Sequence, residues 1–330
     1  MTTVFVTGGS GFVGGRLITR LVADGHTVRA LARSDSAAAR VSELGATAVR
    51  GDLGDVTGLR TAAAGAELAF HAAARTTRDG DRARFWADNV DGTANVVRAA
   101  RDAGVRRLVH VGTEAALMAG RPLVDVDETV PVRPDSRAWY AASKAAAERV
   151  VLAANDETLQ TVVLRPRFVW GAGDTTVLPE LVAMVSSGRF AWVGGGRHLT
   201  DTTHVDNAVE GLVLAARRGV PGEAYFVTDG DPVVFRDFVT DLLATQAVTA
   251  PTRTLPAFLA RMAAGAGEAI WRGLRRNGAP PLDYMSLWLS SQECTINIAK
   301  ARAELGYRPP RTRSDGLAEL RAAAGSVAGS

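Results

Sequence analysis

Residues 3–14, Thr-Val-Phe-Val-Thr-Gly-Gly-Ser-Gly-Phe-Val-Gly, decide how this chain begins to fold. The run of β-branched and aromatic side chains predicts a buried strand, and the glycines after it predict a tight turn into a helix. In that context TGxxGxxG is typical of a dinucleotide-binding turn. Gly8 permits the turn, Gly11 lets the backbone approach a pyrophosphate, and Gly14 allows close packing of helix on strand. The helix N-terminus then faces the phosphates.

Outward from this turn, strand and helix patterns alternate. We expect strands at 3–8, 27–33, 46–50, 68–72, 107–112 and 160–165, and helices at 14–24, 37–44, 56–64, 85–103 and 138–155. Such alternation predicts an α/β fold with a doubly wound parallel sheet of the Rossmann type. Glycines and prolines interrupt the pattern later. We therefore expect a Rossmann domain at 1–170, completed by segments near 201–228, and a smaller, mostly helical substrate-binding lobe with lid helices and a tail at 171–330.

Composition narrows the class of protein. The 38 basic and 35 acidic side chains are spread along the chain, so a nucleic-acid-binding surface is not expected. The single cysteine excludes an intramolecular disulfide and favours a reducing, cytoplasmic location. Neither a signal peptide nor an integral membrane segment is expected, because no apolar run reaches about 18 residues. No metal site is expected, because the five histidines lack ligand spacing; they are His26, His71, His110, His198 and His204.

Lysine is rare in this arginine-rich chain, yet Lys144 lies one helical turn after Tyr140 in Trp-Tyr-Ala-Ala-Ser-Lys (139–144). Spacing i, i+4 on a helix places both side chains on one face. An ammonium beside a phenol favours the phenolate, so we expect Lys144 to lower the pKa of Tyr140 and suit it to acid/base chemistry. Chance alignment on an ordinary surface helix is the alternative interpretation.

The residues expected at the adenosine end of a cofactor allow either NADP(H) or NAD(H). Where an acidic residue would hold the ribose 2′-hydroxyl of NAD(H), the second strand ends at Arg33, which suits the 2′-phosphate of NADP(H). Asp35 follows closely, so NADP(H) is favoured and NAD(H) remains the alternative. After the third strand, Asp52 and Leu53 are expected against the adenine. After the fourth strand, the alanines at 72–74 leave room for the cofactor backbone.

Several separated motifs occur in order along residues 3–320: TGGSGFVG (7–14), GDL (51–53), HAAA (71–74), NVDGTAN (89–95), YxxxK (140–144), LRPRFVWG (164–171) and HVDN (204–207). Together they resemble the extended short-chain dehydrogenase/reductase superfamily, which includes NAD-dependent epimerases and dehydratases. The resemblance implies that Tyr140 is the general acid/base, that Lys144 holds the nicotinamide ribose, and that Thr113 supplies a catalytic hydroxyl. The expected cofactor-binding residues are Gly8, Ser10, Gly11, Phe12, Val13, Arg33, Asp52, Leu53, Ala72, Ala73, Ala74, Tyr140, Lys144, Pro166 and Phe168.

Thr113 departs from the superfamily pattern, which usually shows Ser-Ser where this chain has Val-Gly-Thr-Glu (111–114). A threonine keeps the O–H donor that a developing oxyanion requires. Capping of the strand end is the alternative role for Thr113. Glu114 receives no role from the sequence, and Asn89 is expected to brace the central helix through its amide.

A second departure concerns the class of substrate. Nucleotide-sugar members typically carry an arginine six residues before the residue that corresponds to Asp206, where it meets the sugar-nucleotide phosphates. Here that position holds Thr200, and Arg197 is three residues early. The pattern instead resembles the 3β-hydroxysteroid dehydrogenase branch, which includes sterol dehydrogenases and 2-alkyl-3-oxoalkanoate reductases.

Apolar side chains in the second half predict a pocket for an apolar substrate, lined by Phe190, Trp192, Trp271, Met285 and Trp288. For any one of them, core packing is the alternative role. The amphipathic pattern at 255–288 predicts helices that form a lid over this pocket. Peripheral membrane contact and a subunit contact in a homodimer are the alternatives for that segment.

These observations predict an NAD(P)(H)-dependent oxidoreductase that interconverts a secondary alcohol and a ketone on an apolar small molecule, either steroid-like or a β-keto acid derivative. Two alternatives remain open. One is a nucleotide-sugar epimerase or dehydratase that retains tightly bound NAD. The other is a non-catalytic NAD(P)-sensing protein that keeps the fold.

Overall fold

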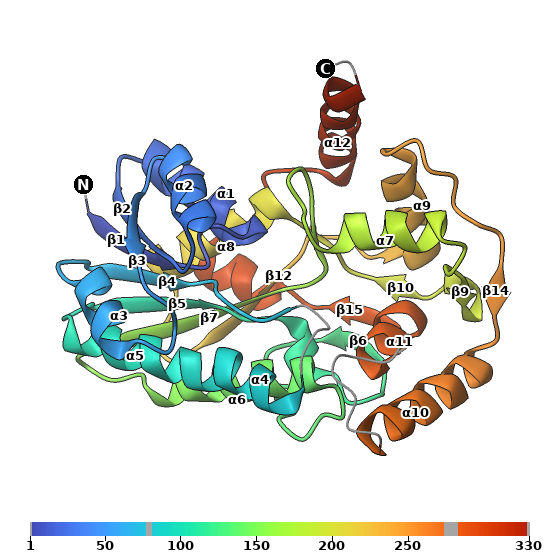
Figure 1. Cartoon of the computed structure of the whole chain (residues 1–330), viewed down its shortest axis with the longest axis horizontal. Helices are drawn as coiled ribbons and strands as arrows, with labels where there is room; N and C mark the ends of the chain where they lie inside the picture. The colour runs from blue at the N-terminus through green and yellow to red at the C-terminus, as the bar shows by residue number, and fades with distance from the viewer. Residues whose placement is uncertain (1, 77–80, 274–282, 329–330) are drawn as a thin grey trace.

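A computed structural model of the chain describes residues 2–76, 81–273 and 283–328. Its largest element is a seven-stranded sheet in which every neighbouring pair of strands is parallel (Figure 1). In spatial order the strands are β12 (Ala224–Val227), β7 (Gln160–Pro166), β5 (Arg107–Val111), β4 (Leu68–His71), β1 (Thr3–Thr7), β2 (Thr27–Ala32) and β3 (Thr47–Arg50). The chain runs outward from β1 to β3 and then crosses back to β4, which confirms the predicted doubly wound Rossmann topology.

Helices cover both faces of this sheet, which explains why consecutive residues of β1 are buried on either side of it. Val4 and Val6 belong to the core that contains side chains of α1 and α8, whereas Phe5 belongs to the core that contains side chains of α3 and α5. The helices of the larger domain are α1 (Phe12–Ala23), α2 (Asp35–Glu43), α3 (Val56–Ala63), α4 (Arg82–Trp86), α5 (Gly92–Asp102), α6 (Trp139–Ala153) and α8 (Val205–Arg218).

The helix expected at 85–103 is interrupted. A π-helical turn, Ala87–Asp91, separates α4 from α5. Asn89 lies in this turn, where its Oδ1 accepts the N–H of Arg75 at 2.6 Å and its Nδ2 donates to Ser143 Oγ of α6 at 2.9 Å. The predicted bracing role of the Asn89 amide is therefore a tie between this helix, the segment after β4, and α6.

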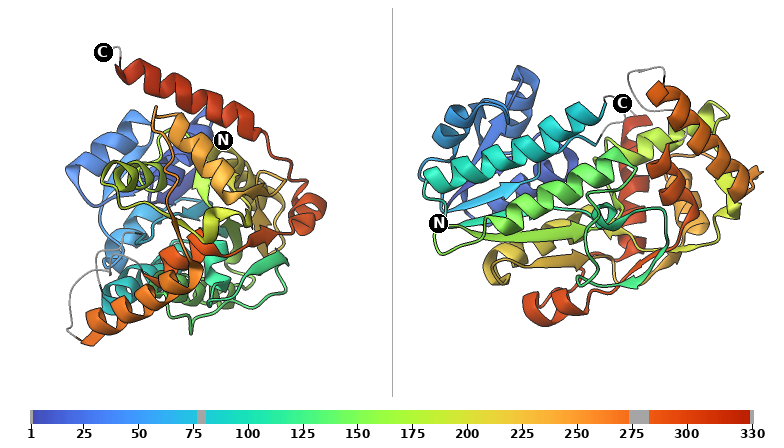
Figure 2. Two further views of the ribbon diagram at one scale, coloured as in Figure 1. Left: turned by 90° about the vertical axis from the view of Figure 1, so that its right-hand side faces the viewer. Right: turned by 90° about the horizontal axis from the view of Figure 1, so that it is seen from below.

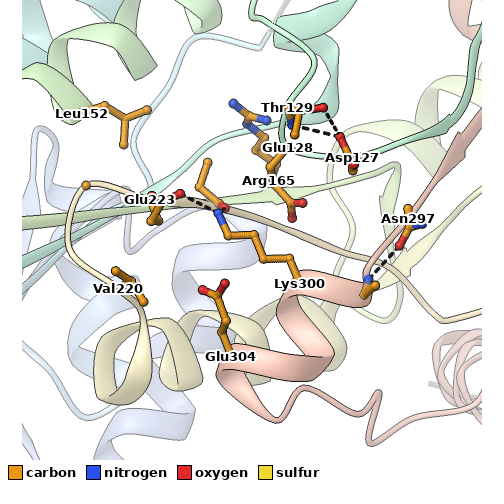
Figure 3. Close-up of a pocket in the computed structure, with 13 residues that line it drawn as sticks. Asp127, Glu128, Thr129, Leu152, Arg165, Val220, Glu223, Asn297, Lys300 and Glu304 are labelled. Atoms are coloured by element: carbon orange, nitrogen blue, oxygen red, sulfur yellow. Dashed lines mark hydrogen bonds and ion pairs between the residues drawn. The ribbon is translucent and has the colours of Figure 1, made fainter.

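The open edge of the sheet, β12, is protected by side chains. Glu128 Oε1 accepts the N–H of Phe226 at 2.7 Å, and Lys300 Nζ donates to the carbonyl of Ala224 at 3.0 Å and to Glu223. These groups lie around the hollow shown in Figure 3. Charged side chains that satisfy edge backbone groups prevent another strand from pairing there, so we interpret this hollow as structural.

The smaller lobe is assembled from distant segments around a four-stranded sheet. Its strands are, in spatial order, β13 (Val233–Val234), β10 (Leu199–Thr200), β15 (Cys294–Ile296) and β6 (Leu123–Val126). Short strand pairs join β8 (Val169–Trp170) to β11 (Thr203–His204) and β9 (Trp192–Val193) to β14 (Thr254–Leu255). The helices are α7 (Val177–Ser186), α9 (Phe235–Ala244), α10 (Ala257–Gly273), α11 (Tyr284–Ser291) and α12 (Arg313–Ala328).

Helices α10 and α11 occupy most of the segment predicted as lid helices, and residues 274–282 of that segment lie outside the described residues. Helix α10 runs along the outside of the smaller lobe, on the side away from α12 (Figure 2). Its apolar Phe258, Met262 and Ile270 are 63%, 68% and 52% exposed. Within the described residues, none of the helices combines the length and apolar character needed to cross a membrane. Peripheral membrane contact, a homodimer and the cytoplasmic location stay predictions.

Candidate active site

The glycine turn after β1 is as tight as the sequence predicts. Gly8 has a φ of +75°, and a Cβ at this position would lie 2.5 Å from the amide nitrogen of Ala73. A Cβ on Gly14 would lie 2.2 Å from the carbonyl oxygen of Gly8. Gly11 is exposed and precedes α1, whose N-terminus has no side-chain cap and no acidic residue in its first turn. This backbone cradle, which leads into a helix N-terminus without a side-chain cap, fits the pyrophosphate of a dinucleotide.

Small residues and a buried hydrogen-bond chain shape the crevice between β1 and β4. Ala72, Ala73 and Ala74 are partly exposed and follow β4 directly beside the glycine turn. Below them Thr7 Oγ1 lies 2.7 Å from His71 Nδ1, and His71 Nε2 lies 2.9 Å from Thr93 Oγ1. Burial, together with the nearby Lys144 ammonium, lowers the pKa of His71 to about 3, so the imidazole is neutral. The sequence analysis missed this bridge, because its partners lie far apart along the chain.

The expected adenosine end of the site carries two arginines. Arg33 is exposed at the end of β2, and Arg50 ends the neighbouring strand β3, in register with Ala32. Asp35 begins α2 and lies 3.5 Å from Arg50 Nη1. Arg50 is therefore a basic residue at this position that the sequence analysis missed. Arg50 can be placed near Arg33 only when the pairing of β2 with β3 and its register are known.

Asp52 and Leu53 follow β3 at the same edge of the sheet. Asp52 is exposed, and its Oδ1 accepts the N–H of Gly54 at 2.7 Å. Leu53 is half-buried, and its carbonyl accepts the amide of Asn95 at 2.8 Å. Both residues are anchored at the carboxyl ends of parallel strands, where ligands of doubly wound folds bind.

Lys144 lies in the second turn of α6 and is almost completely buried. Its Nζ donates to the carbonyl of Val111 at 2.8 Å and lies 3.3 Å from His110 Nε2. Burial lowers the pKa of Lys144 to about 8, while the Glu148 carboxylate acts in the opposite direction. The helix thus brings the ammonium to the end of β5, two residues before Thr113.

Tyr140 begins the same helix and is half-buried. Its pKa lies above the ordinary value for tyrosine, because burial and the Glu114 carboxylate disfavour the phenolate, and a hydrogen bond with Thr113 opposes them. The sequence analysis expected the opposite direction, caused by Lys144. In the structure the Lys144 ammonium is engaged by Val111 and His110, which explains the difference.

Thr113 lies two residues after the last residue of β5 and is buried. Its Oγ1 donates to Glu114 Oε2 at 2.8 Å and accepts the N–H of Ala115 at 3.2 Å. The hydroxyl therefore caps the turn after the strand, which was the alternative role, and also interacts with Tyr140. The two roles coexist at one oxygen.

Pro166 and Phe168 connect the end of β7 to the smaller lobe. Pro166 is buried at the last position of the strand. Phe168 is partly exposed and has a φ of +43°, a conformation that is strained for a residue with a side chain. Its ring contacts that of Phe238 edge to face, with centroids 5.7 Å apart. This packing holds the strained segment at the border of the two parts of the molecule.

The structure places the apolar residues expected around the substrate in separate parts of the smaller lobe. Phe190 and Trp192 pack against each other in a cluster between α7 and α9, and Trp192 is only 1% exposed. Met285 and Trp288 belong to α11 instead, where the Trp288 ring stacks on Tyr284. Trp271 is partly exposed on α10. The geometry assigns Trp192 to the core of the lobe, whereas Met285 keeps an accessible surface.

Thr200, which stands where nucleotide-sugar enzymes typically carry an arginine, is not accessible to a ligand. Thr200 is fully buried, and its Oγ1 accepts a hydrogen bond from Arg167 Nη2 at 3.0 Å. Arg197 is exposed on the turn before β10. The site of the usual phosphate-binding arginine is thus filled by a threonine that faces the protein interior.

One group of potential metal ligands exists among the described residues: His204, Asp206 and Glu319 offer ligand atoms within 4.8 Å of one another. Arg16 already binds both Asp206 oxygens and Glu319 Oε1. His204 Nδ1 accepts the N–H of Asp206. Since the carboxylates are neutralised by a guanidinium, this cluster is better explained as a tie between α1, α8 and α12.

The glycine cradle, the Tyr–Lys pair on α6 and the hydroxyl after β5 lie at the carboxyl edge of one parallel sheet. That combination defines a class: short-chain dehydrogenases and reductases, which act on alcohol and carbonyl groups with a nicotinamide dinucleotide. The comparisons with known proteins place the chain within this class.

The chain belongs to the 3-beta hydroxysteroid dehydrogenase/isomerase family, whose profile matches residues 5–257, and it is an oxidoreductase. It is 49% identical over 319 residues to the 4-hydroxy-2-methyl-3-oxo-4-farnesyl-3,4-dihydroquinoline-1-oxide ketoreductase of Stigmatella aurantiaca, covering 97% of this chain and 96% of the relative. It is 38% identical to the 2-alkyl-3-oxoalkanoate reductase of Stenotrophomonas maltophilia, covering 97% and 98%. The dTDP-glucose 4,6-dehydratase of Streptomyces venezuelae shares the fold, with a TM-score of 0.78 at 24% identity over 99% and 98% of the two chains.

Proposed function

We propose that this protein is an NADP(H)-preferring reductase that interconverts a ketone and a secondary alcohol on an apolar small molecule, such as a β-keto acid derivative or a steroid-like ketone. The observation that carries the proposal is that Tyr140 interacts with Thr113 while Lys144 of the same helix reaches the end of β5, at the edge of the sheet where the glycine turn lies. Lys144 binds the carbonyl at the end of β5, and Tyr140 interacts with the hydroxyl that follows it.

The proposed chemistry moves one proton through this chain's own side chains. Bound NADPH would supply the hydride that adds to the carbonyl carbon. As negative charge develops on the carbonyl oxygen, Thr113 stabilises it by a hydrogen bond and Tyr140 donates its phenolic proton to it. Because the pKa of Tyr140 is raised, the protonated form that reduction consumes is present at neutral pH. Oxidation of the alcohol requires the opposite form of the same phenol.

Lys144 is proposed to hold the nicotinamide ribose. An ammonium has three donors, and two are directed at Val111 and His110. The third is available for a ribose hydroxyl at the carboxyl edge of the sheet. An arginine would be a poor substitute, since its rigid planar fork suits bidentate binding of anions, whereas a compact ammonium can donate to several separate acceptors.

The preference for NADP(H) rests on the two arginines at the ends of β2 and β3. Arg33 and Arg50 are both exposed on neighbouring strands, and a 2′-phosphate binds well between two guanidinium groups. Asp35, the residue that could favour NAD(H), begins a helix and faces Arg50 instead. The proposed adenine contacts are Asp52 and Leu53.

An apolar substrate is supported by Thr200 and by the names of the relatives. The buried Thr200 leaves no guanidinium for sugar-nucleotide phosphates. The relatives are named for a farnesyl-bearing oxo compound and for a 2-alkyl-3-oxoalkanoate. Met285 and Trp288 of α11 are the aromatic and apolar side chains that we propose to contact such a substrate.

The proposal is tested by following NADPH and NADH oxidation with alkyl β-keto esters, steroid ketones and, as controls, nucleotide sugars. We expect turnover of an apolar ketone with released NADP⁺ and a lower KM for NADPH than for NADH. Purified protein that carries stoichiometric NAD and acts only on nucleotide sugars would overturn the proposal in favour of an epimerase or dehydratase. Binding of NADPH without turnover of any ketone would instead favour a cofactor sensor.

A further inference from the structure

Glu114, to which the sequence assigned no role, is bonded to the proposed catalytic hydroxyl. It is 3% exposed, and its Oε2 accepts the O–H of Thr113 at 2.8 Å. Its other oxygen, Oε1, pairs with Arg167 Nη1 at 2.5 Å. A buried carboxylate is tolerated only with such a partner, because removal of charge from water is costly. The ion pair therefore stands directly behind Thr113.

Arg167 is itself held by the smaller lobe. It is fully buried at the end of β7, and its Nη2 donates to Thr200 Oγ1 of β10 at 3.0 Å. Its backbone N–H donates to Thr203 Oγ1 of β11 at 3.0 Å, and the Thr203 hydroxyl donates back to its carbonyl at 2.7 Å. The two lobes thus jointly hold one guanidinium, and that guanidinium holds Glu114.

A threonine hydroxyl has one proton to donate. While it is given to Glu114, the Thr113 oxygen can only accept; it accepts the N–H of Ala115, and the phenol of Tyr140 is a second donor to it. When a ketone binds, the same proton must leave Glu114 and turn to the substrate oxygen. The carboxylate therefore competes with the substrate for the Thr113 proton and sets how the hydroxyl and the phenol face each other.

We propose that Glu114, held by Arg167, is a positioning residue: by accepting the Thr113 O–H it fixes the direction of that hydroxyl, so that the Thr113 oxygen can accept a hydrogen bond from Tyr140. This inference rests on the proposed function, in which Tyr140 is the acid. It makes the ion pair a device that biases the site toward ketone reduction. Thr200, where nucleotide-sugar enzymes bind phosphate, serves here to complete that device.

The charges around the pair agree with this role. Burial and then Glu114 raise the pKa of Tyr140. Arg167 pairs with Glu114, the Glu114 carboxylate acts on the Tyr140 phenol through its charge, and Lys144 lies further along the helix of Tyr140. Cys294 of β15 and His198 also surround Arg167, but burial raises the pKa of Cys294 to about 12 and lowers that of His198 to about 4, so both are neutral. Asp201 is the other acidic group that acts on Arg167.

The test is the pH dependence of kcat/KM in both directions for Glu114→Gln. A variant without the carboxylate charge has a lower Tyr140 pKa. The alkaline limb of ketone reduction and the acidic limb of alcohol oxidation should then both move to lower pH, by about one unit, with NADPH affinity retained. A residue with only a structural role would lower both profiles in height and leave the limbs in place; that result would overturn the proposal.

A second variant covers the case in which Glu114→Gln leaves Arg167 uncompensated and the protein fails to fold. The double variant Glu114→Gln, Arg167→Met removes both charges together, and it should show the same shift of both limbs. Glu128→Gln, which changes a glutamate at the β12 edge, is the matched control and should keep the wild-type limbs. If Tyr140→Phe is inactive while neither Glu114 variant shifts a limb, this inference fails and the proposed function stands. A fully active Tyr140→Phe would remove both.

Discussion

The larger sheet and the smaller lobe are built by different means. In the larger sheet, neighbouring strands pair over four or five residues, and the inner strands β1, β4, β5 and β7 are buried on both faces, so the apolar pattern of each of these segments suffices to place it. In the smaller lobe, β10 contributes two residues and meets β15 through the single pair Thr200–Cys294. Two apolar clusters around α7 and α9 pack that lobe, and buried polar side chains such as Thr200, Asp201 and Thr203 join its short strands. The proposed cofactor-binding part is thus formed mainly by regular strand pairing and the glycine turn. The proposed substrate-binding part depends mainly on contacts between side chains.

The site draws on both parts. The proposed acid, Tyr140, comes from the larger domain, whereas the arginine behind Glu114 is held by Thr200 and Thr203 of the smaller lobe. The larger domain thus supplies the proposed proton donor, and the smaller lobe holds the arginine that pairs with Glu114 next to the proposed catalytic hydroxyl. Variants in the larger domain should therefore change catalysis or cofactor binding, whereas a variant in the smaller lobe should change the pH dependence of stability.

The largest effect is expected for Tyr140→Phe, which tests whether the chemistry resides in the larger domain. Loss of the proton donor should lower kcat/KM for ketone reduction about 100- to 10,000-fold, while NADPH binding, measured by fluorescence titration, is retained. Tyr225→Phe removes a phenol at the sheet edge that bonds Glu304 and Val220, and it is the control. Equal losses in the two variants would contradict the assignment.

Gly14→Ala tests the backbone rule for the cofactor half. The new methyl group would lie 2.2 Å from the Gly8 carbonyl, so α1 must move away from the turn. We expect a loss of about 1–3 kcal/mol in the free energy of unfolding and a large loss of NADPH affinity. Gly325→Ala, which meets no atom within 4 Å, should leave both unchanged or slightly raise stability. Unaltered cofactor binding in Gly14→Ala would show that the turn is not a phosphate cradle.

Asp201→Asn tests the polar interior of the smaller lobe. Asp201 is 1% exposed; its Oδ2 accepts the N–H of Ile296 at 2.8 Å, and its Oδ1 has no partner among the described residues. Burial raises its pKa to about 6. Its folded-state pKa exceeds the unfolded value, so its contribution to stability is present below about pH 4 and is lost as pH rises through 6. The cost near neutral pH is about 3 kcal/mol.

The measurement for Asp201 is Tm between about pH 4 and 7.5. The wild type should lose stability across this range relative to Asp201→Asn, in which that dependence is absent. Asp241→Asn, at an exposed position of α9, should follow the wild type. Parallel pH curves for wild type and Asp201→Asn would mean that the buried carboxylate titrates normally.

The smallest effect is expected for the choice between NADPH and NADH. In the larger domain the backbone forms the dinucleotide turn, but two side chains are proposed to select the cofactor. Arg33→Ala and Arg50→Ala should each raise the KM for NADPH about tenfold, equivalent to about 1.4 kcal/mol, and leave the KM for NADH unchanged. Arg40→Ala, exposed on α2, should change neither. Equal effects on both cofactors would remove the 2′-phosphate assignment.

The predicted strands of the larger sheet and the glycine turn agree with the structure within one or two residues, because local patterns specify them. The helix expected at 85–103 failed at Asn89, where a π turn creates the bracing contact with Ser143. The direction of the Tyr140 pKa was also wrong. Helical spacing placed Lys144 correctly, but the ammonium bonds to Val111, and the carboxylate next to Thr113 acts on the phenol instead.

By itself the sequence determined the Rossmann sheet, the dinucleotide turn, the Tyr–Lys pair and the family. These features depend on residues close together in the chain, where periodicity and glycine sterics act. Only the tertiary structure decided that Arg50 lies beside Arg33, that Trp192 is core, and that Glu114, Arg167 and Thr200 form a chain behind the proposed catalytic hydroxyl. Those contacts join segments far apart in sequence, and burial, which sets the charge of each group, exists only once the segments have packed.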